Sequence, residues 1–345
     1  MGATDSEALP GLDLNRLTEW VATARPDMLA GPLVGRLISG GRSNLTYVIS
    51  DDRSEWILRR PPLGHVLATA HDMAREYRVM SALAGTDVPV PETFALCADR
   101  DVLGAPFYLM ENVAGTPYRA AAELTSLGAD RTRVIATGMV DSLAVLHSVD
   151  PSAVRLEDFG RPSGFLQRQI HRWKKQLDAS FSRELSAALE LYELLAAHQP
   201  EPSPDGIIHG DYRLDNILVG TDDQVAAVID WEMATVGDPL TDVALLVLYQ
   251  RLGELGIPGV SEVASAPGYL TEDEILDRYA ARSGRDLAHF GFYLGLAAFK
   301  LAAILEGIHY RYINGKTVGP GFDTVGDVVG PLLRTGIASV KEKDR

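Results

Sequence analysis

Three side chains in the middle of the sequence, Asp211, Asn216 and Asp230, have the types and spacing of a metal-dependent transfer site. Apolar residues run on both sides of the turn-rich tract 220–224, which predicts a short β-hairpin. We expect this hairpin to bring Asn216 close to Asp230. A carboxamide and a carboxylate are hard oxygen ligands suited to magnesium that carries nucleotide phosphates. Asp211, upstream on the same loop, is placed to accept a proton from an acceptor hydroxyl, so the segment predicts phosphoryl transfer.

The motif around Asp211 is His209-Gly-Asp-Tyr-Arg-Leu-Asp-Asn216, whose spacing matches the kinase pattern H-x-D-x-x-x-x-N. Asp230 stands where the kinase metal-binding aspartate would be, but it is followed by Trp-Glu rather than Phe-Gly. With this ending, the motif resembles the aminoglycoside phosphotransferase and choline kinase branch of the protein-kinase-like fold. The other interpretation is a surface loop with ordinary acidic residues, although two apolar runs around this spacing are hard to obtain by chance.

The resemblance covers most of the chain and implies an enzyme, a small-molecule kinase that moves the γ-phosphate of ATP, with magnesium, onto a hydroxyl. It implies that Asp211 orients and deprotonates the acceptor, while Asn216 and Asp230 hold the metal. The sequence has neither an Ala-Pro-Glu segment nor an obvious activation segment after Asp230, which disfavours a protein substrate.

Three further segments, 59–62, 146–150 and 237–242, resemble a subfamily whose kinase-like domain is sometimes fused to acyl-CoA dehydrogenase domains. That resemblance implies a hydroxylated acyl compound as acceptor, with an aminoglycoside as the second candidate. A hypothesis of another class is a nucleotide-binding module with little or no catalysis. It is motivated by Arg59, which stands where kinases carry a lysine, and the intact Asp211, Asn216 and Asp230 argue against it.

The order of the predicted elements matches a two-lobed α+β fold of the protein-kinase type. Residues 1–113 are expected to form a nucleotide-binding lobe with a small antiparallel sheet, and residues 114–345 a large, mainly helical lobe. The link between them is expected at 113–117. In the first lobe we predict a lead-in helix at 12–24, strands at 34–38, 45–50, 55–59, 94–98 and 107–112, and a helix at 69–83. In the second we predict helices near 131–148, 165–195, 238–252, 272–282 and 287–312, with the hairpin as its main β element.

The turn between the first two strands contains Gly40, Gly41, Ser43 and Asn44. Glycines allow the backbone to approach a ligand closely, and small polar side chains can donate hydrogen bonds. The turn lacks the full G-x-G-x-x-G spacing. Its place in the sheet predicts that it covers the nucleotide phosphates, whereas Gly-Gly turns in general need no such role.

Arg59 is the predicted phosphate ligand of the third strand, and Glu76 on the following helix is its best candidate partner. Kinases use a lysine and a glutamate at these places. Arginine keeps the charge but is bulkier and grips phosphate with two nitrogens, so the phosphate geometry is expected to differ. Arg60 is a competitor for the role, but alternation along the strand puts the two arginines on opposite faces. The register favours Arg59.

The strand at 107–112 runs into a glycine-containing link at Gly115. By position, backbone groups near Glu111 and Val113 are expected to read the adenine ring. An ordinary buried strand is the alternative.

Other polar residues near the motif have expected roles of their own. Arg213 either contacts the transferring phosphate or forms an ion pair with Asp215 or another nearby carboxylate. Asp238 and Asp242 open a helix, where carboxylates cap free N–H groups. The resemblance implies that Asp242 braces the catalytic loop and that His209 positions it.

Three more histidines, His147, His171 and His309, lack metal-ligand spacing and are expected to be structural. Residues 290–312 either line an acceptor pocket or form core.

Composition excludes several classes of function. The formal net charge of -15 argues against nucleic-acid binding. The single cysteine, Cys97, excludes an internal disulfide and a cysteine-rich zinc site. The first residues lack a basic start and an apolar run, so we expect no signal peptide and a cytoplasmic protein. The apolar stretch 287–308 contains Lys300 and Glu306 and is expected to be a buried helix rather than a membrane span. The sequence leaves the oligomeric state open.

Overall fold

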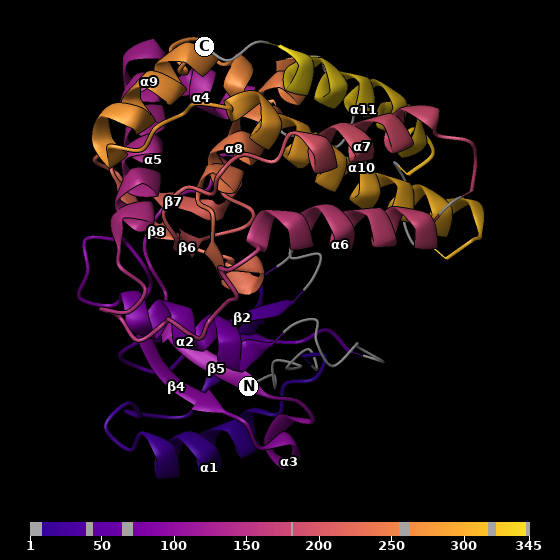
Figure 1. The fold of residues 1–345 in the computed structure, drawn as a ribbon. Coiled ribbons are helices and arrows are strands. Elements are labelled where there is room, and N and C mark those ends of the chain that lie inside the picture. Colours follow the sequence, from indigo (N-terminus) through magenta and orange to yellow (C-terminus); the bar gives the residue numbers. More distant parts are fainter. Residues whose placement is uncertain are drawn as a thin grey trace. The chain divides into compact units, whose positions relative to one another are not determined.

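The computed structural model describes residues 9–38, 44–63, 72–180, 182–254, 262–316 and 322–342. The chain forms two compact units, and Figure 1 labels their elements. The first unit comprises Met1–Ala114 together with Ala226–Glu232, and the second comprises Gly115–Val225 together with Met233–Arg345. The segment Ala226–Glu232 therefore belongs with the N-terminal residues, although the sequence favoured two continuous domains.

An antiparallel sheet of five strands, in the order β1-β2-β3-β5-β4, forms the centre of the first unit. All five strands were predicted, and their ends differ from the prediction by one residue at most. A short helix, α3, lies between β4 and β5 and was not predicted. The elements are α1 (Leu14–Ala24), β1 (Val34–Leu37), β2 (Leu45–Ser50), β3 (Glu55–Arg60), α2 (Met73–Leu83), β4 (Thr93–Cys97), α3 (Arg100–Leu103) and β5 (Phe107–Glu111).

Helix α1 begins at a side-chain cap, because the Asp13 carboxylate accepts hydrogen bonds from the N–H groups of residues 15 and 16. Its apolar stripe, with Leu17 and Val21 fully buried, joins a core with Leu58 and Phe107 from the sheet. Helix α1 therefore covers the sheet face to which the even-numbered side chains of β3 point.

Helix α2 contributes to the other side of the sheet. Arg59 and Tyr108 are cross-strand partners on β3 and β5, and both contact Glu76 of α2. Arg60 points away from them and donates to the backbone carbonyls of Gly11 and Leu103. The expected alternation of the two arginines is thus confirmed. Of the two arginines, Arg59 is therefore the one that contacts α2.

The second unit is mainly helical and contains the small sheet β6-β9 and strand β7. Helices α10 and α11 pack side by side (Figure 1). Its elements are α4 (Ala121–Leu127), α5 (Ala129–Ser148), α6 (Phe165–Ala179), α7 (Ser186–Ala197), β6 (Gly206–Ile208), β7 (Ile217–Val219), β9 (Thr235–Gly237), α8 (Leu240–Glu254), α9 (Glu272–Ser283), α10 (Phe290–Ile313) and α11 (Val325–Lys341), with 3-10 turns at Leu214–Asn216 and Val263–Ser265. Strand β8 (Val225–Val228) and the 3-10 turn Trp231–Met233 lie mostly in the segment that belongs to the first unit.

The predicted single helix 165–195 was wrong, because α6 ends at Ala179 and α7 starts at Ser186. Helices α4 and α11 and the β6-β9 pair were not predicted. Helix α11 contains Pro331 and three glycines, which sequence patterns treat as helix breakers. Packing against α10 and α7 compensates for the hydrogen bond that Pro331 cannot make.

Helix α10 is long and apolar enough to cross a membrane by length and composition, but 72% of its most apolar window is buried inside the fold. Leu296, Phe299 and Leu301 are among its buried residues. The expectation of a buried core helix is confirmed. Its one lysine, Lys300, is half-buried by surface area, and its amine group lies inside the unit.

Candidate active site

The predicted site residues belong to both units. Asp211, Arg213 and Asn216 belong to the second unit. Arg59, Glu76 and Asp230 belong to the first.

Asp211 follows β6, a fully buried strand that pairs with β9 and delivers the loop 209–211. One carboxylate oxygen of Asp211 accepts a hydrogen bond from the hydroxyl of Tyr249 on α8, at 3.1 Å. The other accepts from the amide nitrogen of Asn216, also at 3.1 Å. Burial raises the pKa of Tyr249, so the phenol stays protonated and donates. The Asp211 side chain is 32% exposed, so the carboxylate is held at both oxygens and still open to solvent.

Asn216 ends the 3-10 turn that follows Asp211. Its amide nitrogen donates to the Asp211 backbone carbonyl at 2.9 Å as well as to the carboxylate. With the nitrogen engaged twice, the amide oxygen is the atom of this side chain that is suited to coordinate a metal. Within this unit, the structure therefore links Asp211 and Asn216 directly.

Asp242, in the first turn of α8, anchors the catalytic loop. It is buried, and its carboxylate accepts from the N–H groups of His209 at 2.6 Å and Gly210 at 2.8 Å. Burial acts to raise the pKa of Asp242, but hydrogen bonds from His147 and from the loop outweigh it, so the pKa is lowered and the carboxylate stays charged. The expected bracing role of Asp242 is confirmed, and His147 supports it from α5 through its ring nitrogen, 3.3 Å away.

Gly210 is the one residue of this loop that must be glycine. Its φ is 87°, and a Cβ there would lie 2.6 Å from the carbonyl oxygen of Met233. His209 is fully buried, and its Nδ1 accepts a hydrogen bond from the Asp211 N–H at 3.3 Å. This contact fits the expected positioning role, in which His209 shapes the loop.

Lys300 and Tyr249 contact the loop, and neither was predicted to belong to the site. The amine of Lys300, on α10, donates to the Gly210 carbonyl at 2.8 Å and lies 5.8 Å from the centroid of the Trp173 ring. Burial lowers the pKa of Lys300. A single lysine within a long apolar helix was the available signal for it, because a buried cation needs a partner. No such signal marked Tyr249.

Arg213 forms the ion pair that was one of its two predicted readings. Its guanidinium pairs with Asp215, and its Nε lies 3.9 Å from the Asp211 carboxylate. The guanidinium also sits over the Tyr249 ring, 5.3 Å from the centroid. Contact with a transferring phosphate remains a prediction.

In the first unit, Arg59 joins two carboxylates. Its Nε lies 3.4 Å from Glu76, and its Nη2 pairs with Asp230. Tyr108 donates to the same oxygen of Glu76, Oε2, at 2.9 Å. Burial raises the pKa of Glu76 to about 7, against the opposing effect of Arg59. The ion pair between Arg59 and Glu76 is the one that the sequence predicted.

Asp230 has a φ of 68°, a left-handed conformation that is uncommon for a residue other than glycine. Such conformations concentrate at functional sites, where surrounding contacts hold them in place. Here the contact is the ion pair with Arg59. The carboxylate is 29% exposed, so part of it faces solvent.

The other predicted nucleotide-binding residues are placed unequally. Gly40, Gly41 and Ser43 lie outside the described residues. Asn44 is buried, and its amide nitrogen donates to Glu76 and Glu232, both at 3.1 Å. Its amide is therefore engaged with carboxylates inside the unit, and its contact with phosphates stays a prediction.

Glu111 ends β5, and its N–H donates to the Glu92 carbonyl at 2.8 Å. Val113 follows the strand and is half-buried. Contact of this backbone with the adenine ring stays a prediction.

Comparison with known proteins decides the family. The profile of the phosphotransferase enzyme family matches residues 34–287, about three quarters of the chain. The chain belongs to the phosphotransferase enzyme family. This confirms the resemblance expected from the loop motif.

Two curated relatives of this phosphotransferase are acyl-CoA dehydrogenase family members. Member 11 of Gallus gallus is 34% identical over 321 residues, which are 90% of this chain and 41% of the relative. Member 10 of Mus musculus is 35% identical over 303 residues, 83% of this chain and 27% of the relative. The chain thus spans about two fifths or less of these relatives, and the expected subfamily resemblance is confirmed.

Solved structures confirm the fold class of the phosphotransferase. A candidate aminoglycoside phosphotransferase from Ralstonia eutropha is 33% identical, with a TM-score of 0.83, and the match covers 96% of this chain and 99% of that one. An aminoglycoside phosphotransferase bound to AMP-PNP and hygromycin B is 14% identical, with a TM-score of 0.61, over 94% of this chain and 98% of that one. The second shares the fold. The predicted α+β, protein-kinase-like fold, with a small antiparallel sheet and a largely helical part, is confirmed.

Proposed function

We propose that this phosphotransferase moves the γ-phosphate of ATP onto a hydroxyl group of a small molecule. The observation that carries the proposal is the Asp211 carboxylate, fixed by Tyr249 and Asn216 and still exposed to solvent. A carboxylate held in one position can orient an acceptor hydroxyl and take its proton as the phosphoryl group arrives. Asp242, Lys300 and His209 keep the loop in place and touch no substrate in this scheme.

Arg59 is proposed to hold the phosphates of the nucleotide. Its guanidinium is nearly buried and kept in place by Glu76, as the lysine of a kinase is by its glutamate. A guanidinium can contact two phosphate oxygens at once. The turn with Gly40, Gly41 and Ser43 is proposed to cover these phosphates, and the backbone near Val113 to contact adenine.

The residues present fit magnesium by the chemistry of their donor atoms. Asp230 offers a partly exposed carboxylate, and Asn216 offers an amide oxygen whose nitrogen is engaged elsewhere. Hard oxygen donors of this kind bind magnesium together with substrate phosphates. When bound, magnesium would neutralise charge that develops on the phosphates during transfer.

The acceptor is proposed to be a hydroxylated acyl compound. Support comes from the relatives named as acyl-CoA dehydrogenase family members, which match most of this chain. An aminoglycoside is the second candidate, supported by the name of the Ralstonia eutropha protein.

A nucleotide-binding module without catalysis is the competing function, and one observation favours it. Arg59 already neutralises Asp230, which is the proposed metal ligand. A permanent ion pair there would weaken metal binding, because the carboxylate charge would be compensated before the metal arrives.

Acceptor-dependent release of ADP separates the two functions. We expect the wild-type protein with magnesium and ATP to release ADP only when a hydroxyl acceptor is added, from a panel of hydroxyacyl compounds, aminoglycosides and amino alcohols. The matched variant Asp211→Asn should bind ATP and release ADP on the order of 100-fold or more slowly. Tight ATP binding without release by the wild type, for every acceptor, would contradict the proposal and support the non-catalytic module.

A further inference from the structure

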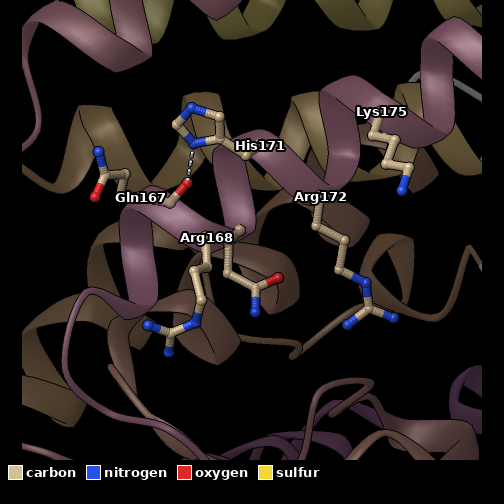
Figure 2. A pocket seen from close by; sticks show the side chains of 6 residues that line it. Gln167, Arg168, His171, Arg172 and Lys175 are labelled. Carbon is tan, nitrogen blue, oxygen red and sulfur yellow. Dashed lines mark hydrogen bonds between the residues drawn. The ribbon is translucent and has the colours of Figure 1, made fainter.

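The exposed face of α6 carries a pocket of about 540 Å³, lined by residues of that helix alone. Figure 2 shows Arg168 and Arg172 pointing to the same side of the helix, with Lys175 one turn further along. Spacings of four and three residues place the three cations on one helical face. This cluster is positively charged, whereas the formal net charge of the whole chain is -15. The remaining lining residues are Gln167, Gln169 and His171.

None of the three cations has a carboxylate at ion-pair distance among the residues that the structure describes. Arg168 donates to the backbone carbonyls before the helix, and Arg172 lies 5.0 Å from the centroid of the Trp173 ring. Lys174, by contrast, pairs with Asp178 at 2.7 Å. Like charges four residues apart on a helix repel each other. An anion bound between them would offset that repulsion.

Helix α6 also lies beside the catalytic loop of the same unit. Its first residue, Phe165, packs against Gly237 of β9, the strand that pairs with the one before the loop. Further along, the Trp173 ring faces the amine of Lys300, which donates to the Gly210 carbonyl. The cationic face is therefore adjacent to side chains that contact the loop.

We propose that Arg172 and Lys175, with the charge of Arg168 nearby, bind a phosphate group carried by the acceptor molecule. This inference rests on the proposed function and specifies its substrate class, an extended hydroxyl compound with phosphate at the end away from the reacting hydroxyl. A guanidinium and an ammonium together provide the several donors that a phosphate needs. A polycationic aminoglycoside would be repelled by the same face.

A pair of compounds that differ by one phosphate tests this proposal. Hydroxybutyryl-4′-phosphopantetheine and hydroxybutyryl-pantetheine carry the same hydroxyl, and calorimetry without nucleotide measures their binding apart from turnover. We expect the wild type to bind the phosphorylated compound on the order of 10-fold or more tightly than the neutral one. The double variant Arg172→Gln/Lys175→Gln should lose this preference, whereas the matched control Lys174→Gln, on the same helix, should keep it.

Both side chains are exposed, so the double variant is expected to keep the wild-type melting temperature. Equal or undetectable binding of the two compounds by the wild type would overturn the proposal, as would a preference that survives in the double variant. ADP release then separates this inference from the proposed function. Preference without any ADP release would uphold the phosphate subsite and contradict catalysis. Equal ADP release with both compounds, unaffected by the double variant, would uphold catalysis and overturn the subsite.

Discussion

Arg59 and Asp230 form an ion pair, although they lie 171 residues apart in the sequence. The pair fixes the segment Ala226–Glu232 within the first unit and holds Asp230 in its left-handed conformation. The proposed phosphate ligand, Arg59, and the proposed metal ligand, Asp230, therefore contact each other directly. Because ATP and magnesium are proposed to bind the two members of this pair, changes at Arg59 should affect both ATP binding and turnover.

Substitution of Arg59 should reveal this double role. We expect Arg59→Ala to raise the KM for ATP and lower kcat, because the cation contacts phosphate in both the ground and transition states. Arg59→Lys should keep partial activity, since the charge remains while the two-nitrogen grip is lost. Arg60→Lys is the control, because Arg60 bonds backbone carbonyls on the opposite face and should affect stability without changing the KM for ATP. Steady-state kinetics with equal constants for wild type and both Arg59 variants would remove Arg59 from the site.

Glu76 should make the stability of the ligand-free protein depend on pH. Its pKa is about 7 in the folded protein and about 4.5 when unfolded, so the folded state binds more protons between these values. The free energy of unfolding should therefore fall as pH rises from about 4.5 to 7. Denaturant titrations of wild type and Glu76→Gln across this range isolate the effect as a difference in slope. Exposed Glu111→Gln serves as the control, and identical slopes for wild type and Glu76→Gln would contradict the assignment.

Lys300 should act on turnover through the catalytic loop. The variant Lys300→Met fits the apolar surroundings of α10 but leaves the Gly210 carbonyl without its donor. Loss of such a hydrogen bond costs about 1–3 kcal/mol. We expect kcat to fall by on the order of 10-fold or more, with the KM for ATP little changed, because the hydrogen bond that is lost is to the catalytic loop. An unchanged kcat in a folded Lys300→Met protein would show that the loop does not need this contact.

Magnesium and ATP should stabilise the protein together more than ATP does alone. A ligand that binds the folded state stabilises it by an amount that grows with the logarithm of the ligand concentration divided by its Kd. The proposed ligands Asn216 and Asp230 need the metal to engage the phosphates. Thermal shift measurements with ATP, with magnesium and with both should show this synergy in the wild type. The variants Asp230→Ala and Asn216→Ala should lose it. If the synergy persists in Asp230→Ala, the metal binds elsewhere.

Much of this site was predictable because its chemistry is encoded in short sequence distances. The spacing from His209 to Asn216 predicted the loop, and strand alternation chose Arg59 over Arg60 before the ion pairs were known. Asp242 was expected to brace the loop and does so through two backbone N–H groups.

The parts that were missed depend on packing between distant elements. Tyr249 reaches Asp211 only because of how α8 is rotated, which a helical pattern cannot specify. Lys300 was noticed as an interruption of an apolar helix, but its partner, a backbone carbonyl 90 residues away, carries no sequence signal. Helix α11 was not predicted, because Pro331 has a low helix propensity and predicts a break there. Tertiary packing stabilises the helix despite this proline.

Asp211 offers the most direct test of the proposed phosphoryl transfer, because the variant Asp211→Asn keeps the shape of the side chain and removes its ability to take a proton. ATP affinity and acceptor-dependent ADP release should be measured together on wild type and Asp211→Asn, with magnesium present. We expect nearly normal ATP binding and a fall in turnover on the order of 100-fold or more, the scale of a lost general base. Wild-type turnover in Asp211→Asn would contradict the assignment of Asp211 as the residue that activates the acceptor.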